Sequence, residues 1–544
     1  MPLVARADAS AHTFDVLIVG AGPAGLSCAF TCHDRGLRVL VLDAGKVRPV
    51  PGSPDVLAAE IECRAHDPTE IVSASALGGS SHWWGGRSVP LDPVDLRNWP
   101  ISWDEMLPWW HYAAELIGAG AVIERPAPGK FSGLMRFSAT TAESWAPDPN
   151  LARRWRARIH APDGPAILLG ARVTGFSHEH GKVTGVHAIA DGASITAKAA
   201  HVVFAGGGLG SLRLMLMAQR EDPSLFGGAD GPLGRGYMGH LTGSIADIVF
   251  NDPKDAAAFG HFTANGAYSA RRRIRSNDDT VEAEDIGNVV WWLDQPQRDA
   301  AAHGSSLMSA KFLAAYGVRL MAGEWGAGDA ELIAPHLANV GRAPWAAATG
   351  LAETAWILAA SRITRQKFRP KAFLSSGGNG WRSVYHSEQR SDPSNRIALS
   401  DRLDSIGLPK LQIGFRFSRP DFDSVVRAHE LLDADLRGAG AGSIRWNGEG
   451  DLHARVEENA HDGYHQIGGA PMGVGPGAIV DRECRAIGFD NLWVTSGCVM
   501  PSGGHANPTL TIMALACRAA DRIASLRKAP GRAAGRELVR AAAE

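Results

Sequence analysis

The segment FDVLIVGAGPAGLSCAFTCHDRGLRVLVLDAG, residues 14–45, decides the fold. An apolar run from Phe14 to Val19 leads into the glycine pattern G-x-G-x-x-G. An apolar stretch follows, ends near Gly36, and gives way to a second apolar run that closes on Asp43. This order predicts a buried strand, a tight turn, a helix and a second strand, which together open a dinucleotide-binding domain.

Each special residue in this segment has a predicted role. Gly20 makes the tight turn, Gly22 lets backbone approach a pyrophosphate, and Gly25 lets the helix pack closely on the strand. Asp43 is placed to bind ribose hydroxyls, which argues against NADP. The motif indicates an ADP moiety without choosing between FAD and NAD.

A second strand–glycine–helix unit, AHVVFAGGGLGSLRLMLMA, lies at residues 200–218, after strand-like segments with turns at HEHG and ADG. Two such units about 185 residues apart predict a doubly wound α/β dinucleotide domain assembled from separated segments. The less regular middle of the chain predicts an inserted α+β substrate domain that carries a sheet. We expect the dinucleotide domain to comprise 12–110, 160–250 and 455–530, the substrate domain 250–455, and a C-terminal tail 531–544.

Bulk composition excludes several classes of protein. A length of 544 residues favours two domains, and a net charge of −2 gives no general attraction to nucleic acid. Cys28 and Cys32 lie one helical turn apart in an apolar helix and are interpreted as core residues. We find no export signal and no apolar run long enough to span a membrane, so a cytoplasmic location is expected.

Four further motifs occur in a fixed order along the chain. They are LGGSSHWWGG at 77–86, GRGYMGH at 234–240, HQIGGAPMG at 465–473 and NPTLTIMAL at 507–515. With the N-terminal segment they make the chain resemble the glucose–methanol–choline (GMC) oxidoreductases, nearest the branch of pyranose oxidases and bacterial glycoside dehydrogenases. The resemblance implies bound FAD and oxidation of a CH–OH group, in a sugar, glycoside or related alcohol, to a carbonyl. The hydride would go to flavin N5.

The resemblance also assigns catalytic residues. His465 would be the base that accepts the hydroxyl proton, and Asn507 would hydrogen-bond the substrate oxygen, with His505 as a reserve candidate. Viewed locally, these residues have plainer interpretations. His465 could be a histidine satisfied by turn carbonyls, His505 a polar loop residue, and Asn507 the N-cap of a helix that begins at Pro508.

The cofactor site is expected to draw on all flavin-domain motifs. Its predicted members are Gly20, Gly22, Pro23, Ala24, Gly25, Asp43, Ala44, Gly78, Gly79, Ser80, His82, Trp83, Trp84, Gly85, Val173, Ala205, Gly206, Gly497, Asn507, Pro508 and Thr509. Some relatives attach FAD through a histidine directly before the tryptophan of the glycine-flanked motif. Trp83 occupies that slot here and His82 precedes it, so we expect non-covalent FAD and no metal; whether His82 links FAD stays open.

Aromatic and basic clusters give the remaining clues. Six tryptophans lie between residues 83 and 110, and Trp291 and Trp292 form a pair; we favour core packing over a sugar platform for them. The run RRRIR, 271–275, is interpreted as a solvated strand or turn.

Several partners and activities stay open. We expect a small-molecule alcohol or sugar substrate, with oxygen or a redox carrier as electron acceptor, no nucleic-acid partner, and a possible oligomer. Alternatives are a sterol or other hydrophobic alcohol oxidase, or a flavin-fold lyase without net redox. An NAD-dependent dehydrogenase is disfavoured because the C-terminal motifs would have no role in it.

Overall fold

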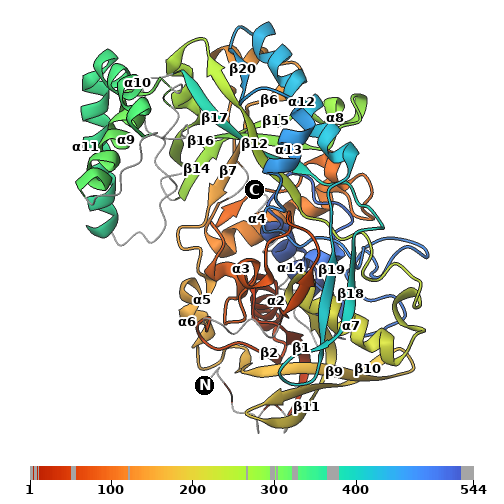
Figure 1. The fold of residues 1–544 in the computed structure, drawn as a ribbon. Coiled ribbons are helices and arrows are strands. Elements are labelled where there is room, and N and C mark those ends of the chain that lie inside the picture. Colours follow the sequence, from red (N-terminus) through yellow and green to blue (C-terminus); the bar gives the residue numbers. More distant parts are fainter. Residues whose placement is uncertain are drawn as a thin grey trace.

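The computed structural model describes Val4, Ala9 and residues 12–50, 57–120, 123–264, 268–294, 301, 304–321, 329–363 and 379–527 (Figure 1). The tail expected at 531–544 lies outside these residues. Two sheets dominate the molecule, and they are stacked along its long axis in Figure 1.

The first sheet is the predicted dinucleotide-binding sheet. Its parallel strands lie in the order β8 (Ala166–Leu169), β2 (Val39–Asp43), β1 (Thr13–Val19), β11 (Ala193–Phe204) and β21 (Leu492–Val494). Strands β9 (Ala171–Glu179) and β10 (Lys182–Ala190) extend β11 in antiparallel fashion. Helix α2 (Pro23–Asp34) follows β1, and α14 (Pro508–Leu526) packs on α2. The central strands are buried on both faces, which explains their unbroken apolar runs.

The second glycine unit has its predicted form as well. Helix α7 (Gly207–Glu221) begins directly after β11, so both glycine turns lie at the carboxyl ends of neighbouring strands. Ligands of open α/β sheets bind at this edge.

The second sheet is antiparallel, in the order β20 (Gly442–Trp446), β12 (His240–Phe250), β17 (Gly380–Glu388), β16 (Val289–Asp294), β15 (Ile274–Ser276) and β6 (Phe137–Ser138). Helix α12 (Arg419–Gly438) packs beside β20. The sheet takes β12 and β6 from outside residues 250–455. The second sheet therefore includes strands that precede the expected insertion.

Two smaller sheets connect these layers. One has the order β13 (His261–Ala264), β14 (Tyr268–Arg272), β7 (Thr141–Trp145) and β4 (Arg87–Ser88), with β5 (Ile123–Glu124) also paired to β7. The other comprises β18 (Arg396–Leu403), β19 (Pro409–Gly414) and β3 (Ala59–Ile61).

The arginine run on β14 contradicts the prediction of a solvated segment. Arg271, Arg272 and Arg273 are only 6%, 7% and 2% exposed. Arg271 forms an ion pair with the buried Glu143 on β7, and Arg272 donates to the backbone carbonyl of Ala139. Burial of Arg271 is therefore possible because Glu143 lies on the neighbouring strand β7. The sequence of the arginine run alone does not indicate this partner.

Most of the predicted tryptophan core is confirmed. Trp99, Trp103, Trp109 and Trp110, around helix α4 (Trp103–Ile117), all pack into the main core. Trp110 donates its indole N–H to Thr511 on α14, so the cluster fastens α4 to the C-terminal helix.

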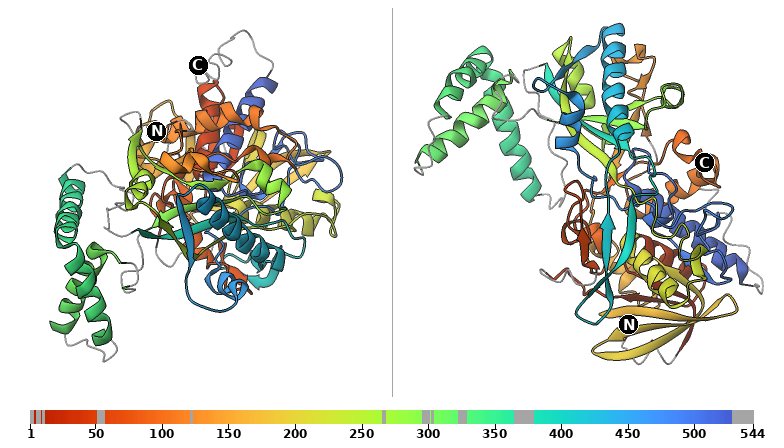
Figure 2. Two further views of the ribbon diagram at one scale, coloured as in Figure 1. Left: turned by 90° about the horizontal axis from the view of Figure 1, so that it is seen from above. Right: turned by 45° about the vertical axis from the view of Figure 1, so that its right-hand side comes forward.

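Three helices form a separate layer. Helices α9 (Ser306–Met321), α10 (Asp329–Arg342) and α11 (Pro344–Ile363) pack on one another and stand away from the sheets in all views (Figures 1 and 2). The shorter helices are α3 (Thr69–Val72), α5 (Leu151–Arg154), α6 (Arg156–Ile159), α8 (Asp278–Ala283) and α13 (Leu452–Asn459). Across the described parts of the chain, no helix combines the length and apolarity needed to cross a bilayer.

Candidate functional site

A cavity of about 1050 Å³ runs from the first glycine turn to the second sheet. Its lining includes the β1–α2 turn, the end of β2, the 3-10 turn η2 (Gly79–His82) and the start of α14. At the other end it is lined by Thr242, Trp292 and His386 from the second sheet. Pockets for one small molecule span about 300–1000 Å³, so this cavity lies at the upper end of that range and suits a ligand as large as a dinucleotide.

The glycines of the first turn fit the predicted dinucleotide site. Gly20 has φ +109°, and a Cβ there would lie 2.5 Å from the Ala205 carbonyl oxygen. A Cβ on Gly25 would lie 1.9 Å from the Gly20 oxygen, whereas a Cβ on Gly22 would meet only the Gly79 Cα, at 3.9 Å. Of these three glycines, Gly22 alone has no close neighbour where its side chain would be, which is compatible with the approach to a pyrophosphate predicted for it.

Asp43 closes β2 at the edge of the cavity. Its carboxylate accepts hydrogen bonds from the backbone N–H groups of Ala21, at 2.6 Å, and Gly45, at 2.7 Å. Burial raises the pKa of Asp43, and these two bonds oppose the rise. A carboxylate held at the end of the second strand is suited to ribose hydroxyls.

Nearly all predicted cofactor residues line this one cavity. They are Gly20, Gly22, Pro23, Ala24, Asp43, Ala44, Gly79, Ser80, His82, Trp83, Trp84, Gly85, Val173, Ala205, Gly206, Gly497, Asn507, Pro508 and Thr509. Gly25 and Gly78 do not line it. Gly25 instead packs α2 on β1, and Gly78, with φ +92°, donates its N–H to the Ala21 carbonyl and so fixes the turn before η2.

The LGGSSHWWGG motif forms the 3-10 turn η2 and the segment directly after it. The ring of His82 is held at both nitrogens: Nε2–H donates to the Leu77 carbonyl at 3.0 Å, and Nδ1 accepts from the Asn150 amide at 3.1 Å. Trp83 is 56% exposed and lines the cavity. Neither nitrogen of His82 is left free.

His465 lies at the end of the cavity beside the second sheet. Isolated bridges join Met238 to Ile467 and Thr242 to His461, so the loop that carries His465 is fastened to β12 on both sides of His240. The residue before it, Tyr464, has φ +63°, a conformation uncommon outside glycine.

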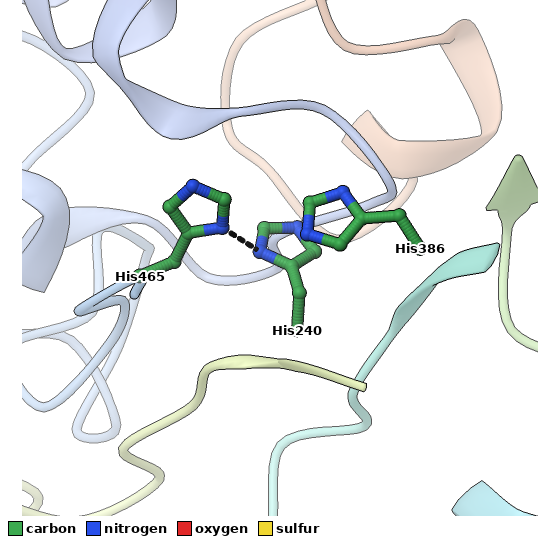
Figure 3. A group of neighbouring side chains, drawn as sticks. All are labelled: His240, His386 and His465. Carbon is green, nitrogen blue, oxygen red and sulfur yellow. Dashed lines mark hydrogen bonds between the residues drawn. The ribbon is translucent and has the colours of Figure 1, made fainter. Parts of the chain in front are cut away.

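Three histidine rings meet at this point (Figure 3). His465 Nδ1 lies 2.8 Å from His240 Nδ1, and their side-chain ligand atoms lie within 4.8 Å of those of His386. His240 Nε2 lies 3.3 Å from the Gly503 carbonyl oxygen, and His386 Nδ1 lies 2.9 Å from the His505 carbonyl oxygen. A carbonyl only accepts, so each of these two nitrogens carries a proton.

These partners fix the tautomer of His465. Because Nε2 of neutral His240 carries its proton, Nδ1 of His240 is an acceptor. His465 must then donate from Nδ1, which leaves the lone pair on Nε2. That atom lies 3.0 Å from the Asn507 amide nitrogen, on the cavity side.

The electrostatic setting keeps the cluster neutral. Burial lowers the pKa of His465 well below 6.5, and the charges of His240 and Arg87 lower it further. Burial likewise lowers the pKa of His240 to about 3 and that of His386 well below its usual value. At neutral pH, His465 therefore presents an uncharged imidazole with an available lone pair.

Asn507 holds the N-cap position of α14, and Pro508 occupies the first turn as predicted. The plainer interpretation of Asn507 as an N-cap holds for its position, but its side chain makes no capping hydrogen bond and is directed to His465 instead.

His505, the reserve catalytic candidate, does not reach the cavity. Its ring is fully buried and Nε2 lies 2.7 Å from an Asp92 carboxylate oxygen. Its contribution to the site is its backbone carbonyl, which accepts from His386.

Sequence reasoning missed His240, His386, Thr242 and Arg87, which all lie at the substrate end. His240 closes the GRGYMGH motif, which could have drawn attention to it. His386, Thr242 and Arg87 sit in strands without a motif, and the pairing of β12 with β17 brings Thr242 opposite His386.

Comparisons with known proteins identify related families and relatives. The family profile described as GMC oxidoreductase matches residues 391–516, and the profile described as FAD binding domain matches residues 15–50. The chain is 24% identical over 595 aligned positions to 2-methyl-1,2-propanediol dehydrogenase of Mycolicibacterium austroafricanum, covering 94% of this chain and 96% of that protein. It is 35% identical over 132 residues to 6'''-hydroxyparomomycin C oxidase of Streptomyces lividus, covering 24% and 23% of the two chains.

Solved structures share the fold. Pyridoxine 4-oxidase from Mesorbium loti superposes with a TM-score of 0.54 at 16% identity, covering 93% of this chain and 98% of that one. Formate oxidase of Aspergillus oryzae superposes with a TM-score of 0.52 at 14% identity, covering 95% and 99%. Together with the glycine turns, Asp43 and the cavity they border, these findings show a GMC oxidoreductase domain at residues 391–516 and an FAD-binding segment at residues 15–50, the two parts of an FAD-dependent oxidoreductase that acts on alcohol groups.

Proposed function

We propose that His465 is the general base for alcohol oxidation and that Asn507 positions the substrate hydroxyl. The observation that supports this most directly is the hydrogen-bond chain from the Gly503 carbonyl through His240 and His465 to Asn507. This chain leaves one lone pair, on His465 Nε2, directed to the cavity. A base must lie within hydrogen-bond reach of the proton that it takes, and here both polar groups border the same space.

In the proposed reaction the hydride would be accepted by the cofactor and the proton by the protein. Bound FAD supplies the hydride acceptor, N5 of the flavin. The substrate hydroxyl takes the place of the Asn507–His465 contact, gives its proton to His465 Nε2, and keeps a hydrogen bond from the Asn507 amide to its oxygen. The carbinol carbon loses a hydride as the proton leaves, so the alcohol becomes a carbonyl with charge and electrons balanced.

The protein holds this arrangement before substrate arrives. His240 removes the second tautomer of His465, and the bridges to β12 remove freedom of the loop. A base that is already fixed in one orientation loses little further entropy in the transition state, and this lowers the activation barrier.

FAD is proposed to be non-covalent. Both ring nitrogens of His82 are engaged with protein groups, and Trp83 occupies the slot in which relatives carry the linking histidine. Flavin should therefore leave the protein on denaturation.

The substrate is proposed to be a sugar, glycoside or related small alcohol. Two relatives are named for a diol and for an aminoglycoside, which supports a polar alcohol over a sterol. The six cysteines are all unpaired, which supports a reducing compartment such as the cytoplasm.

Anaerobic mixing with a panel of alcohols and glycosides tests the function. Bleaching of the flavin with formation of one equivalent of carbonyl product is expected. A lyase would turn its substrate over while the flavin stayed oxidised, so product without bleaching would refute the proposal.

A further inference from the structure

The buried arginine run has no role in the function described so far. Arg271 lies on β14, and its Nε donates to Glu143 Oε1 at 3.0 Å. Arg273, which is also buried, places Nη1 at 3.8 Å from the other oxygen of the same carboxylate. One carboxylate thus faces two guanidinium groups in the interior.

A third arginine stands between this pair and the cavity. Arg87, on β4, lines the cavity, and its guanidinium carbon lies 4.7 Å from the ring centre of Trp292 and 5.9 Å from that of Trp145. Arg271 lies against the same two indoles, at 5.5 and 5.2 Å. Among the described residues no hydrogen bond or ion pair engages the Arg87 guanidinium, although aromatic faces hold it in place.

The side of the cavity formed by Arg87 and the residues behind it therefore carries a net positive charge. Arg87, Arg271 and Arg273 carry three positive charges against one on Glu143, whose pKa they hold down at about 2. Asp92 also acts on Arg273, but its carboxylate is already bonded to His505 and lies 3.5 Å from Arg275. Burial lowers the pKa of the neighbouring His261 to about 4; the charges of Arg271 and Arg87 lower it further, and that of Glu143 opposes them.

A half-buried cation without a partner is costly unless a ligand completes it. The fork of a guanidinium matches the two oxygens of a carboxylate or phosphate. Resting on the function proposed above, we propose that Arg87 binds an anionic group of the substrate, so that the physiological substrate is an alcohol bearing a carboxylate or phosphate.

The position of Arg87 limits the size of this substrate. The Trp292 ring lies 6.1 Å from the ring of His386, which lies 5.2 Å from that of His465. Arg87 is also close enough for its charge to lower the pKa of His465. The anionic group and the reacting hydroxyl therefore belong to one small molecule, such as a hydroxy acid, a sugar acid or a sugar phosphate, and an amino sugar would be repelled.

Matched substrate pairs test the charge preference on the FAD-loaded enzyme. Lactate is compared with propane-1,2-diol and 1-amino-2-propanol, methyl glucuronoside with methyl glucoside, and glycerol 3-phosphate with glycerol. Anaerobic rapid mixing gives the dissociation constant and rate of flavin reduction for each. The anionic members should bind about 10- to 100-fold more tightly than their neutral partners, as expected for a charge-assisted hydrogen bond, and the cationic ones more weakly still. A preference confined to carboxylates or to phosphate identifies the group.

Arg87→Gln should abolish this preference, and Arg87→Lys should restore part of it because the charge remains without the fork. Arg419→Gln, at an exposed surface pair with Asp423, is the matched control and should leave the preference unchanged. Flavin absorbance titrated with lactate, glucuronate and inorganic phosphate reports binding even if no compound of the panel is oxidised.

The outcomes separate this inference from the proposed function. Anion binding that depends on Arg87, without bleaching by any alcohol, would support the anion site and count against the alcohol oxidation. Neutral and anionic alcohols that bleach the flavin equally would overturn the anion site alone. An Arg87→Gln enzyme that keeps the full charge preference would also overturn it, because another group would then bind the anion.

Discussion

Replacing His240 tests whether a buried neighbour sets the tautomer of the catalytic base. His240 does not itself line the cavity and, by our proposal, does not touch the substrate; it acts through its Nδ1 contact with His465. In His240→Ala the Nδ1–H of His465 loses its acceptor. Moving the proton to Nε2 lets that ring donate toward the cavity instead, which destroys the lone pair needed for catalysis.

The size of the effect follows from the cost of the unsatisfied donor. Leaving a buried N–H without a partner costs about 1–3 kcal/mol. The productive tautomer is destabilised by about this amount, which corresponds to a loss of about 5- to 150-fold in the rate constant of flavin reduction. Substrate dissociation constants should change little, because no substrate contact is removed.

Two substitutions of similar size separate tautomer control from packing. Asn places its carbonyl oxygen close to where His240 Nδ1 lies, so His240→Asn should recover most of the rate. Gln reaches only the Nε2 position, so His240→Gln should not. Rapid anaerobic mixing at saturating substrate, normalised to flavin content, measures all three.

A double-mutant cycle gives the decisive comparison. Once His465 is replaced by Ala, the tautomer has no meaning, so adding His240→Ala should change the residual rate by less than about twofold. If the two losses multiplied instead, or if His240→Ala reduced the flavin at the wild-type rate, the reasoning would be refuted.

Four further outcomes are expected. His465→Ala should keep FAD, since Gly22 and Asp43 lie at the other end of the cavity, and should slow flavin reduction about 10²- to 10⁴-fold in rapid mixing; an unchanged rate would exclude His465 as the base. Asn507→Ala should slow reduction less and leave the melting temperature within about a degree of wild type, because the side chain makes no capping bond; a large loss of stability would contradict this. The folded pKa values of His240, His386 and His465 lie below the unfolded value near 6.5, so unfolding takes up protons below that pH. The free energy of unfolding should therefore fall by up to about 1.4 kcal/mol per pH unit for each histidine. Denaturant titration measures this, and a free energy of unfolding that is constant between pH 7 and 5 would argue against neutral burial. Prolonged dialysis against a chelator should leave flavin reduction unchanged, because hydrogen bonds already use both nitrogens of His240; loss of rate with recovery on added zinc would assign the three histidines to a metal.

The cofactor end of the site could be predicted from sequence because its constraints are local. Gly20, Gly22 and Gly25 serve one strand–turn–helix unit, and their spacing alone carries the geometry. His465 and Asn507 lie 42 residues apart, and only the order of motifs related them before the structure showed their contact.

The substrate end could not be predicted because it depends on distant partners. Arg271 looked like a surface residue until β14 paired with β7 and brought Glu143 to it. His240 and His386 meet because β12 and β17 are adjacent, although about 145 residues separate them in the sequence. Burial of a charged or polar side chain is decided by such pairings, which no local pattern reports.

Strand β21 is synthesised about 290 residues after β11, the strand with which it pairs, and this order determines when the first sheet can be completed. The edge of β11 at Val202–Phe204 pairs with Leu492–Val494, and Gly497, Asn507, Pro508 and Thr509 complete the lining of the cavity that the first glycine turn begins. At about 5–20 residues per second, a ribosome needs roughly 15–60 s to add the residues between these two strands. During that time a parallel strand edge stays open, and the flavin has no complete site to enter. A complete flavin site therefore exists only after these last residues have been made, and until then the exposed strand edge can pair with other chains.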